Sequence, residues 1–107
     1  MVIKTDKKII YKKINQYIDV ILRNRINIST VYLFGSYKKS IFNADSDIDI
    51  AIVLDDYKGD RIDILFMLLK LRREIDLKIE PHPFKKSEFV ATNPFAKEII
   101  KTGEKIY

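Results

Sequence analysis

The sequence predicts an α/β (α+β) fold in which helices pack on a small mixed β-sheet. Strand-like apolar runs alternate along the chain with segments of helical apolar spacing, and only three Gly and three Pro interrupt them. The 107 residues, 47% hydrophobic and 33% charged, suffice for one folded core but not for a second lobe. We therefore expect residues 1–107 to form a single domain.

A first helix is predicted from about Asp6 to Arg25, with Asp6 as its N-cap. Apolar residues at spacings of three and four form one face of this helix: Ile10, Ile14, Tyr17, Ile18, Ile21 and Leu22. We expect that face to cover one side of the sheet.

Two apolar strands follow, Val31–Phe34 and a second that Asp47-Ile48-Asp49 opens and that runs to Leu54. Between them, residues 36–41 are predicted to form a short helix and residues 43–46 a turn. The first strand therefore leads through a short connection into the second.

The segment from Asp60 to about Glu74 has apolar residues over more than half of a helical circumference, which predicts a well-buried helix. Its acidic first turn and basic last turn complement the helix dipole. Because this helix is a crossover between two strands, we expect those strands to be parallel neighbours or to enclose another strand.

Residues 75–80 alternate strictly between apolar and polar side chains, which predicts a strand. Asp76, Lys78 and Glu80 share its polar face. A solvated sheet edge would explain all three, and so would a role in a polar site.

Pro81-His82-Pro83 excludes a continued helix or an inner strand, and we interpret His82 as a residue of a rigid loop. The last helix is predicted over residues 94–102. Asn93 is its expected N-cap and Gly103 its stop.

Asp47 and Asp49 stand at alternate positions of an otherwise apolar strand, where Asp is depleted. Their side chains point the same way from Cα atoms about 6.6 Å apart, so both carboxylates can converge on one or two hard cations. Mg²⁺ is usually held by one or two carboxylates with phosphates and water, and Mn²⁺ is the alternative. The chain has no Cys and one His, which argues against thiolate chemistry and a structural zinc site.

Gly35 and Ser36 supply the other half of the predicted site. A glycine at a strand end lets the backbone approach a phosphate, and the N–H groups that open a following helix attract anions. The serine hydroxyl adds a donor. Gly-Ser alone is typical of ordinary turns, but here a paired-aspartate strand follows ten residues later.

Gly35-Ser36, ten residues and Asp47-x-Asp49 resemble the signature of the DNA polymerase β-type nucleotidyltransferase superfamily, and the chain length is similar to that of its minimal nucleotidyltransferase (MNT) group. The resemblance implies a metal-dependent transfer of a nucleoside monophosphate, with AMP from ATP as the first expectation, to a hydroxyl, with release of pyrophosphate. Asp47 and Asp49 would be catalytic metal ligands, and Gly35 and Ser36 would hold phosphates.

The segment Ile79–Phe84 resembles the one that carries the third acidic ligand in one branch of this group. That likeness implies Glu80 as the third catalytic metal ligand, and Asp76, on the same predicted face, is the alternative. Lys78 shares this face and either reaches a phosphate or is a plain surface lysine.

Lys38 and Lys39 complete the predicted nucleotide-binding set. Family members often carry a basic residue directly after the serine and a glycine three residues further on. This chain has Tyr37 and Ser40 at those positions, so the two lysines are expected to supply the positive charge.

The net charge of +5 is spread over scattered Lys and Arg pairs, and no helix-turn-helix pattern is present, so nucleic acid is not the expected partner. Members of this group are often encoded beside a HEPN-type protein, which implies an alternative function as an antitoxin-like binding module. No apolar run approaches the roughly 18 residues of a membrane helix. The N-terminus does not resemble a signal peptide, so we expect a cytoplasmic protein without membrane contact.

Overall fold

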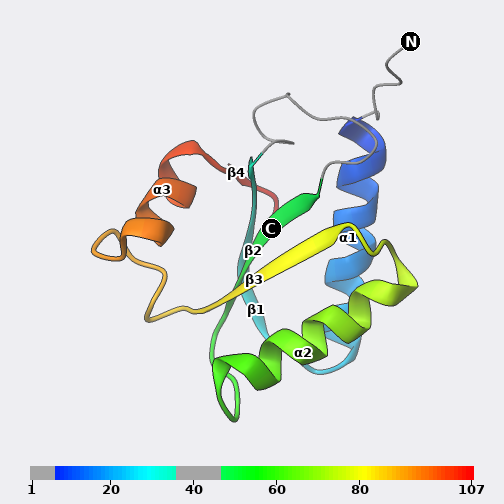
Figure 1. Cartoon of the computed structure of the whole chain (residues 1–107), viewed down its shortest axis with the longest axis horizontal. Coiled ribbons are helices and arrows are strands. Elements are labelled where there is room, and N and C mark those ends of the chain that lie inside the picture. The colour runs from blue at the N-terminus through cyan, green and yellow to red at the C-terminus, as the bar shows by residue number, and fades with distance from the viewer. Residues whose placement is uncertain (1–6, 36–46) are drawn as a thin grey trace.

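The architecture is a four-stranded mixed sheet with helices packed on it, which confirms the predicted class (Figure 1). The structure is a computed structural model and describes residues 7–35 and 47–107. The elements in chain order are α1 (Lys7–Arg23), β1 (Ile28–Phe34), β2 (Ile48–Leu54), α2 (Arg61–Leu71), the 3₁₀ helix η2 (Arg72–Glu74), β3 (Ile79–Lys85), α3 (Pro94–Thr102) and β4 (Glu104–Lys105). The predicted cap Asp6 and the predicted elements at 36–41 and 43–46 lie outside the described residues.

The strand order of the sheet is β3-β2-β1-β4. β1 pairs antiparallel with both β2 and β4, whereas β2 and β3 are parallel neighbours. α2 makes the crossover that a parallel pair requires. The predicted parallel arrangement is therefore confirmed, and β3 forms one edge of the described sheet.

α1 and α2 close one face of the sheet. Ile48, Ile50 and Ile52, at alternate positions of β2, are buried there in the larger of the two core clusters. The hydroxyl of Tyr17 on α1 donates to the carbonyl of Leu68 on α2, which ties the two helices together. Burial raises the pKa of this hydroxyl.

The opposite face of the sheet carries a smaller core beneath α3. Its buried members come from β2, β3 and α3: Ala51, Val53, Phe84 and Ile99. Figure 1 shows α1 and α3 on opposite sides of the sheet. Because strand side chains alternate, the aspartate at position 49 belongs to this second face.

α3 begins and ends where the sequence predicts. The side chain of Asn93 accepts hydrogen bonds from the N–H groups of Phe95 and Ala96, and Pro94 occupies the first helical position. Gly103 follows as the C-cap. The N-cap and the C-cap each involve residues close together in the chain, so both can be predicted from the sequence.

The strand predicted over residues 75–80 is wrong in its bounds, because β3 begins at Ile79 and continues through both prolines. The N–H of Lys86 donates to the carbonyl of Leu54 in β2, and the carbonyl of Lys78 accepts from β2 at the other end. Even-numbered residues thus direct their backbone groups toward β2. Pro81 and Pro83, which lack an N–H, face the open edge, where that group is not needed.

The expectation that α2 is well buried is also wrong. Ile64, Leu68 and Leu71 are buried, but Ile62 and Phe66 are 59% and 65% exposed. The helix is apolar on two sides, and only one side has the sheet and α1 to pack against. None of the described helices has the length and apolar character needed to cross a membrane.

Candidate functional site

The two aspartates of the predicted site lie at the beginning of β2. Asp49 is the second residue of the strand and is half-buried, whereas Asp47 precedes the strand and is exposed. Side-chain alternation along β2 places Asp49 toward the α3 side of the sheet. Its apolar neighbour Ile48 points into the core beneath α1 and α2.

Glu80 lies directly beside Asp49. The two residues are register partners in the parallel pair β2–β3, and neighbouring strands are about 4.8 Å apart. Both side chains emerge on the same face of the sheet, because paired residues of adjacent strands do. Strand pairing thus brings together two acidic residues that are far apart in the sequence.

Asp76, the alternative third ligand, is directed elsewhere. It lies in the turn before β3, and its carboxylate accepts a hydrogen bond of 2.6 Å from Lys13 on α1 and one of 2.8 Å from the N–H of Lys78. Burial alone would raise the pKa of Asp76, but these bonds and the two lysine charges outweigh it, so the pKa lies below its ordinary value. The described geometry therefore favours Glu80 as the neighbour of Asp49.

Gly35 lies at the end of β1, immediately against Asp49. Its φ angle is +76°, and a Cβ atom at this position would come within 2.5 Å of Asp49 Oδ2. Phe34, the preceding residue, is the register partner of Asp49 across the β1–β2 pair. A residue other than glycine would meet both backbone strain and a clash with the carboxylate.

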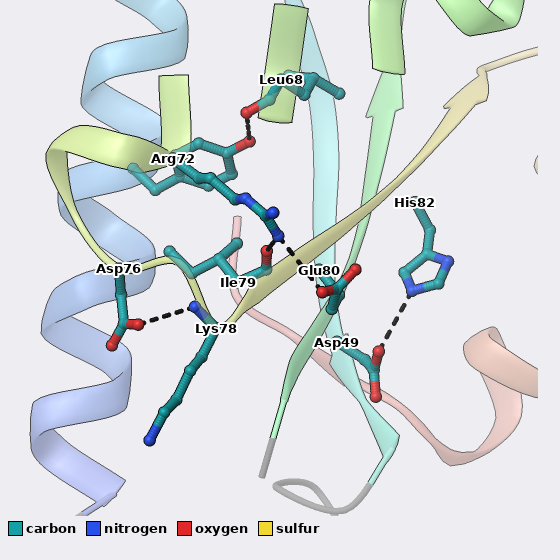
Figure 2. Close-up of polar contacts among 9 residues, drawn as sticks. Asp49, Leu68, Arg72, Asp76, Lys78, Ile79, Glu80 and His82 are labelled. Carbon is teal, nitrogen blue, oxygen red and sulfur yellow. Dashed lines mark hydrogen bonds and ion pairs between the residues drawn. The ribbon is translucent and has the colours of Figure 1, made fainter. Parts of the chain in front are cut away.

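Each carboxylate of the pair contacts a nitrogen-bearing side chain (Figure 2). His82 Nε2 lies 3.3 Å from Asp49 Oδ1, and Arg72 Nη1 donates to Glu80 Oε1 over 3.3 Å. The same Arg72 nitrogen donates to the carbonyl of Ile79 over 2.7 Å. These contacts bring two potentially cationic groups to a site with two acidic side chains.

Sequence reasoning missed Arg72 and His82 at this site. His82 lies in the edge strand β3 and not in the predicted rigid loop, because the two prolines exclude an inner strand but not an edge strand. It follows Glu80 at the strand period of two. Arg72 belongs to the basic last turn that the sequence predicts for the second helix, and nothing local shows that its guanidinium spans from the end of α2 to β3.

Aromatic rings border the carboxylates on the α3 side. The His82 ring lies 5.0 Å from that of Phe34, edge to face, and 6.0 Å from that of Phe95. Phe95 is 48% exposed, so the ring cluster is open to solvent on one side. Such a cluster offers an apolar wall beside a charged site.

Lys78 does not share the strand face of Glu80, contrary to the prediction. It lies in the turn that precedes β3, and its carbonyl accepts a hydrogen bond of 2.8 Å from the N–H of Ile48. Figure 2 shows its side chain directed away from the carboxylates of Asp49 and Glu80. The error follows from starting the strand four residues too early. Ser36, Lys38 and Lys39 lie outside the described residues, so their predicted phosphate contacts stay predictions.

The donor set at this site suits a hard divalent cation. Its acidic groups are carboxylates, the ligands that Mg²⁺ and Mn²⁺ prefer, and the space beside Asp49 Oδ2 is kept open by a glycine. Within residues 7–35 and 47–107, no three acidic or histidine side chains are gathered closely enough to hold a metal. Asp49 and Glu80, which lie side by side, match the one or two carboxylates that hold Mg²⁺ together with phosphates and water.

The chain is similar to one known protein family and to several solved structures. The family model described as "Polymerase beta, Nucleotidyltransferase" matches residues 4–107. A crystal structure of a toxin–antitoxin with AMP-PNP is similar with a TM-score of 0.66 and 26% identity, covering 91% of this chain and 72% of that one. A mutant of the toxin–antitoxin MntA-HpeT is similar in fold, with a TM-score of 0.62 and 23% identity over 87% of this chain and 70% of that one. Among curated proteins, no sequence matches the chain significantly.

Proposed function

Because this chain belongs to the Polymerase beta, Nucleotidyltransferase family, we propose that it transfers a nucleoside monophosphate from an NTP to a hydroxyl on a partner protein and releases pyrophosphate. The observation that carries this proposal is the register of Asp49 and Glu80, which places two acidic residues side by side, with Asp49 against Gly35. ATP is the proposed donor, because the similar toxin–antitoxin structure contains AMP-PNP, an analogue of ATP.

Asp47, Asp49 and Glu80 would hold Mg²⁺, or Mn²⁺ in its place. When bound, such ions neutralise triphosphate charge and lower the pKa of the acceptor hydroxyl. Gly35 leaves room for the donor beside Asp49, and the predicted contacts of Ser36, Lys38 and Lys39 would fix its phosphates.

In the proposed reaction the acceptor oxygen forms a bond to the α-phosphorus, and the bond to the bridging oxygen of pyrophosphate breaks. The acceptor proton passes to Glu80 or to solvent. Arg72 holds one oxygen of Glu80, and His82 lies against one oxygen of Asp49. Each of these contacts restricts the rotation of its carboxylate, so Arg72 and His82 act as positioning residues.

The test incubates the chain with Mg²⁺, a candidate partner protein, and ATP labelled either at the α-phosphate or at the γ-phosphate. We expect label in the partner only from the α-position, because AMP and not phosphate is transferred. Asp47→Asn and Asp49→Asn should each abolish the labelling, and Asp76→Asn is the matched control that should retain it. Parallel incubations with the other NTPs and with Mn²⁺ define the donor and the ion. Label from the γ-position, or normal labelling by both mutants, would show that the assignment is wrong.

A second candidate function is that of an antitoxin-like module that acts mainly by binding a HEPN-type toxin. This candidate is favoured by the similar crystal structure at 26% sequence identity, which is that of a toxin–antitoxin. Co-expression of the toxin with the Asp49→Asn chain separates the two. Growth rescued fully by this variant would mean that binding alone suffices, whereas rescue by the unmodified chain alone would mean that transfer is required.

A further inference from the structure

A stripe of apolar side chains lies exposed along the outer side of α2. Ile62, Phe66 and Leu69 recur at spacings of four and three, which places them on one side of the helix. Ile62 is 59% exposed and Phe66 is 65% exposed. A helix in a soluble protein commonly presents polar residues on the side away from its core, and contiguous exposed apolar surface marks interaction sites.

The stripe runs into a hollow at the end of α2. Its volume is about 550 Å³, and it is lined by Phe66, Leu69, Lys70, Arg72, Arg73 and Leu77. Leu77, in the turn before β3, is 63% exposed and adds another apolar side chain to the wall of the hollow. We call the residues of this hollow the α2 groove.

The α2 groove combines apolar walls with positive charge. Three of its lining residues are basic, Lys70, Arg72 and Arg73, and none of those that the structure describes there is acidic. A complementary ligand therefore carries an apolar side chain flanked by carboxylates. The groove's three apolar side chains are those of Phe66, Leu69 and Leu77. Such side chains suit contact with a protein surface better than with a nucleic-acid backbone.

The charges of the α2 groove also disfavour self-association. A twofold dimer brings the same patch of both subunits together, and that arrangement would gather the three basic residues of each subunit in one interface. Arg72 connects the groove with the candidate active site, because it lines the groove and also donates to Glu80. A protein bound there would contact a residue that touches one of the proposed catalytic carboxylates.

We propose that the α2 groove is the docking surface for the partner protein and receives an acidic amphipathic segment, with an apolar side chain against Phe66 and carboxylates at Lys70 and Arg73. This inference rests on the proposed function, which requires a partner that carries the acceptor. It assigns the recognition of that partner to α2, on the side of the helix that faces away from the core.

The test measures the affinity of the full chain for a purified HEPN-type candidate partner, by calorimetric titration at low and high salt. Phe66→Ala and Arg73→Glu should each weaken binding about tenfold or more, as central apolar and charged contacts do. Ile100→Ala and Lys101→Glu on α3 are matched controls, since Ile100 is also exposed (42%), and they should change the affinity by less than about twofold. Added salt should weaken binding by the unmodified chain more than by Arg73→Glu.

Several results would overturn the docking proposal: no complex, equal affinities for all variants, or losses confined to the α3 variants. If the unmodified chain is a dimer and Phe66→Ala is a monomer, the groove binds a second copy of this chain. If RNA competes with the partner for the unmodified chain but not for Arg73→Glu, the groove binds nucleic acid. Calorimetric ATP binding by Phe66→Ala separates the two proposals. If Phe66→Ala loses partner binding but keeps its affinity for ATP, the result supports docking at α2. If the unmodified chain binds the partner but not ATP, docking stands and the proposed transfer is overturned.

Discussion

The two faces of the β2–β3 pair are formed by alternate residues of the same strands, yet they differ in content. Toward α1 and α2, Ile50 and Ile79 are fully buried among other apolar side chains. Toward α3, Asp49 and Glu80 are half-buried, and each contacts a nitrogen of another side chain. The difference teaches that a strand of period two can supply the core with one set of residues and a polar site with the next.

A consequence is that stability and activity should separate between neighbouring positions. The apolar face has close-packed neighbours on every side, so a lost methyl group leaves a cavity there. The polar face is partly solvated, so a lost charge there costs little folding free energy. Substitutions on the two faces, ordered by expected effect, test this division.

The largest expected effect is on the apolar face. Ile50→Ala should lower the free energy of unfolding by about 2–5 kcal/mol, because the residue is 0% exposed. Asp49→Asn, one position earlier, should change it by less than about 1 kcal/mol. Urea unfolding of both variants is the measurement, with Ile50→Val as an intermediate case. A greater loss in Asp49→Asn than in Ile50→Ala would mean that the polar face holds the fold together.

The next effect is on the polar face and concerns activity. Glu80→Gln should slow the chemical step by on the order of 10²-fold, the scale of a catalytic acid–base or ligand group, with little change in NTP affinity. Single-turnover transfer and calorimetric titration measure the two quantities separately. Asp76→Asn, which alters the acidic residue in the preceding turn, should change neither. Equal effects of Glu80→Gln and Asp76→Asn would contradict the assignment of Glu80 as the third metal ligand, which rests on its register with Asp49.

Gly35 lies where the polar face meets β1, and a matched glycine exists far from the site. Gly35→Ala and Gly59→Ala introduce a Cβ at φ +76° and +83°, within 2.5 Å and 2.6 Å of the carboxylates of Asp49 and Asp63. Each should cost about 1–2 kcal/mol of unfolding free energy for the left-handed backbone alone. Only Gly35→Ala should also reduce transfer, because only that Cβ displaces Asp49. Thermal melts and transfer assays on both variants check this, and a comparable loss of transfer in Gly59→Ala would show that strain alone is responsible.

The smallest effect concerns the Lys13–Asp76 pair, which joins α1 to the turn before β3. The pKa of Asp76 lies below its ordinary value, so the pair stabilises the fold above the unfolded-state pKa of Asp, and this contribution is lost as the pH falls through the folded-state value. Lys13→Met should therefore cost less than about 1 kcal/mol at neutral pH and still less in acid. Urea unfolding at both pH values measures it, with Lys12→Met as the control. A loss as large in acid as at neutral pH would exclude the ion pair as its cause.

The sequence by itself determined the features that depend on neighbouring residues. Asn93 caps α3 through the N–H groups that follow it, so its hydrogen bonds are local. Asp49 points away from the core because its neighbours Ile48 and Ile50 point into it, and Gly35 follows the end of β1 where the sequence places it. The sequence therefore sufficed to predict the mixed sheet and, through the spacing of Gly35-Ser36 and Asp47-x-Asp49, the resemblance to the nucleotidyltransferases.

Only the tertiary structure decided which distant side chains meet. Both Asp76 and Glu80 fit an alternating pattern, but the pairing of β3 with β2 set Glu80 beside Asp49 and left Asp76 bonded to Lys13. Arg72 entered the site from the end of α2 for the same reason. Local periodicity fixes the direction of a side chain relative to its own strand, whereas register and packing depend on contacts between segments far apart in the chain, which no local pattern specifies.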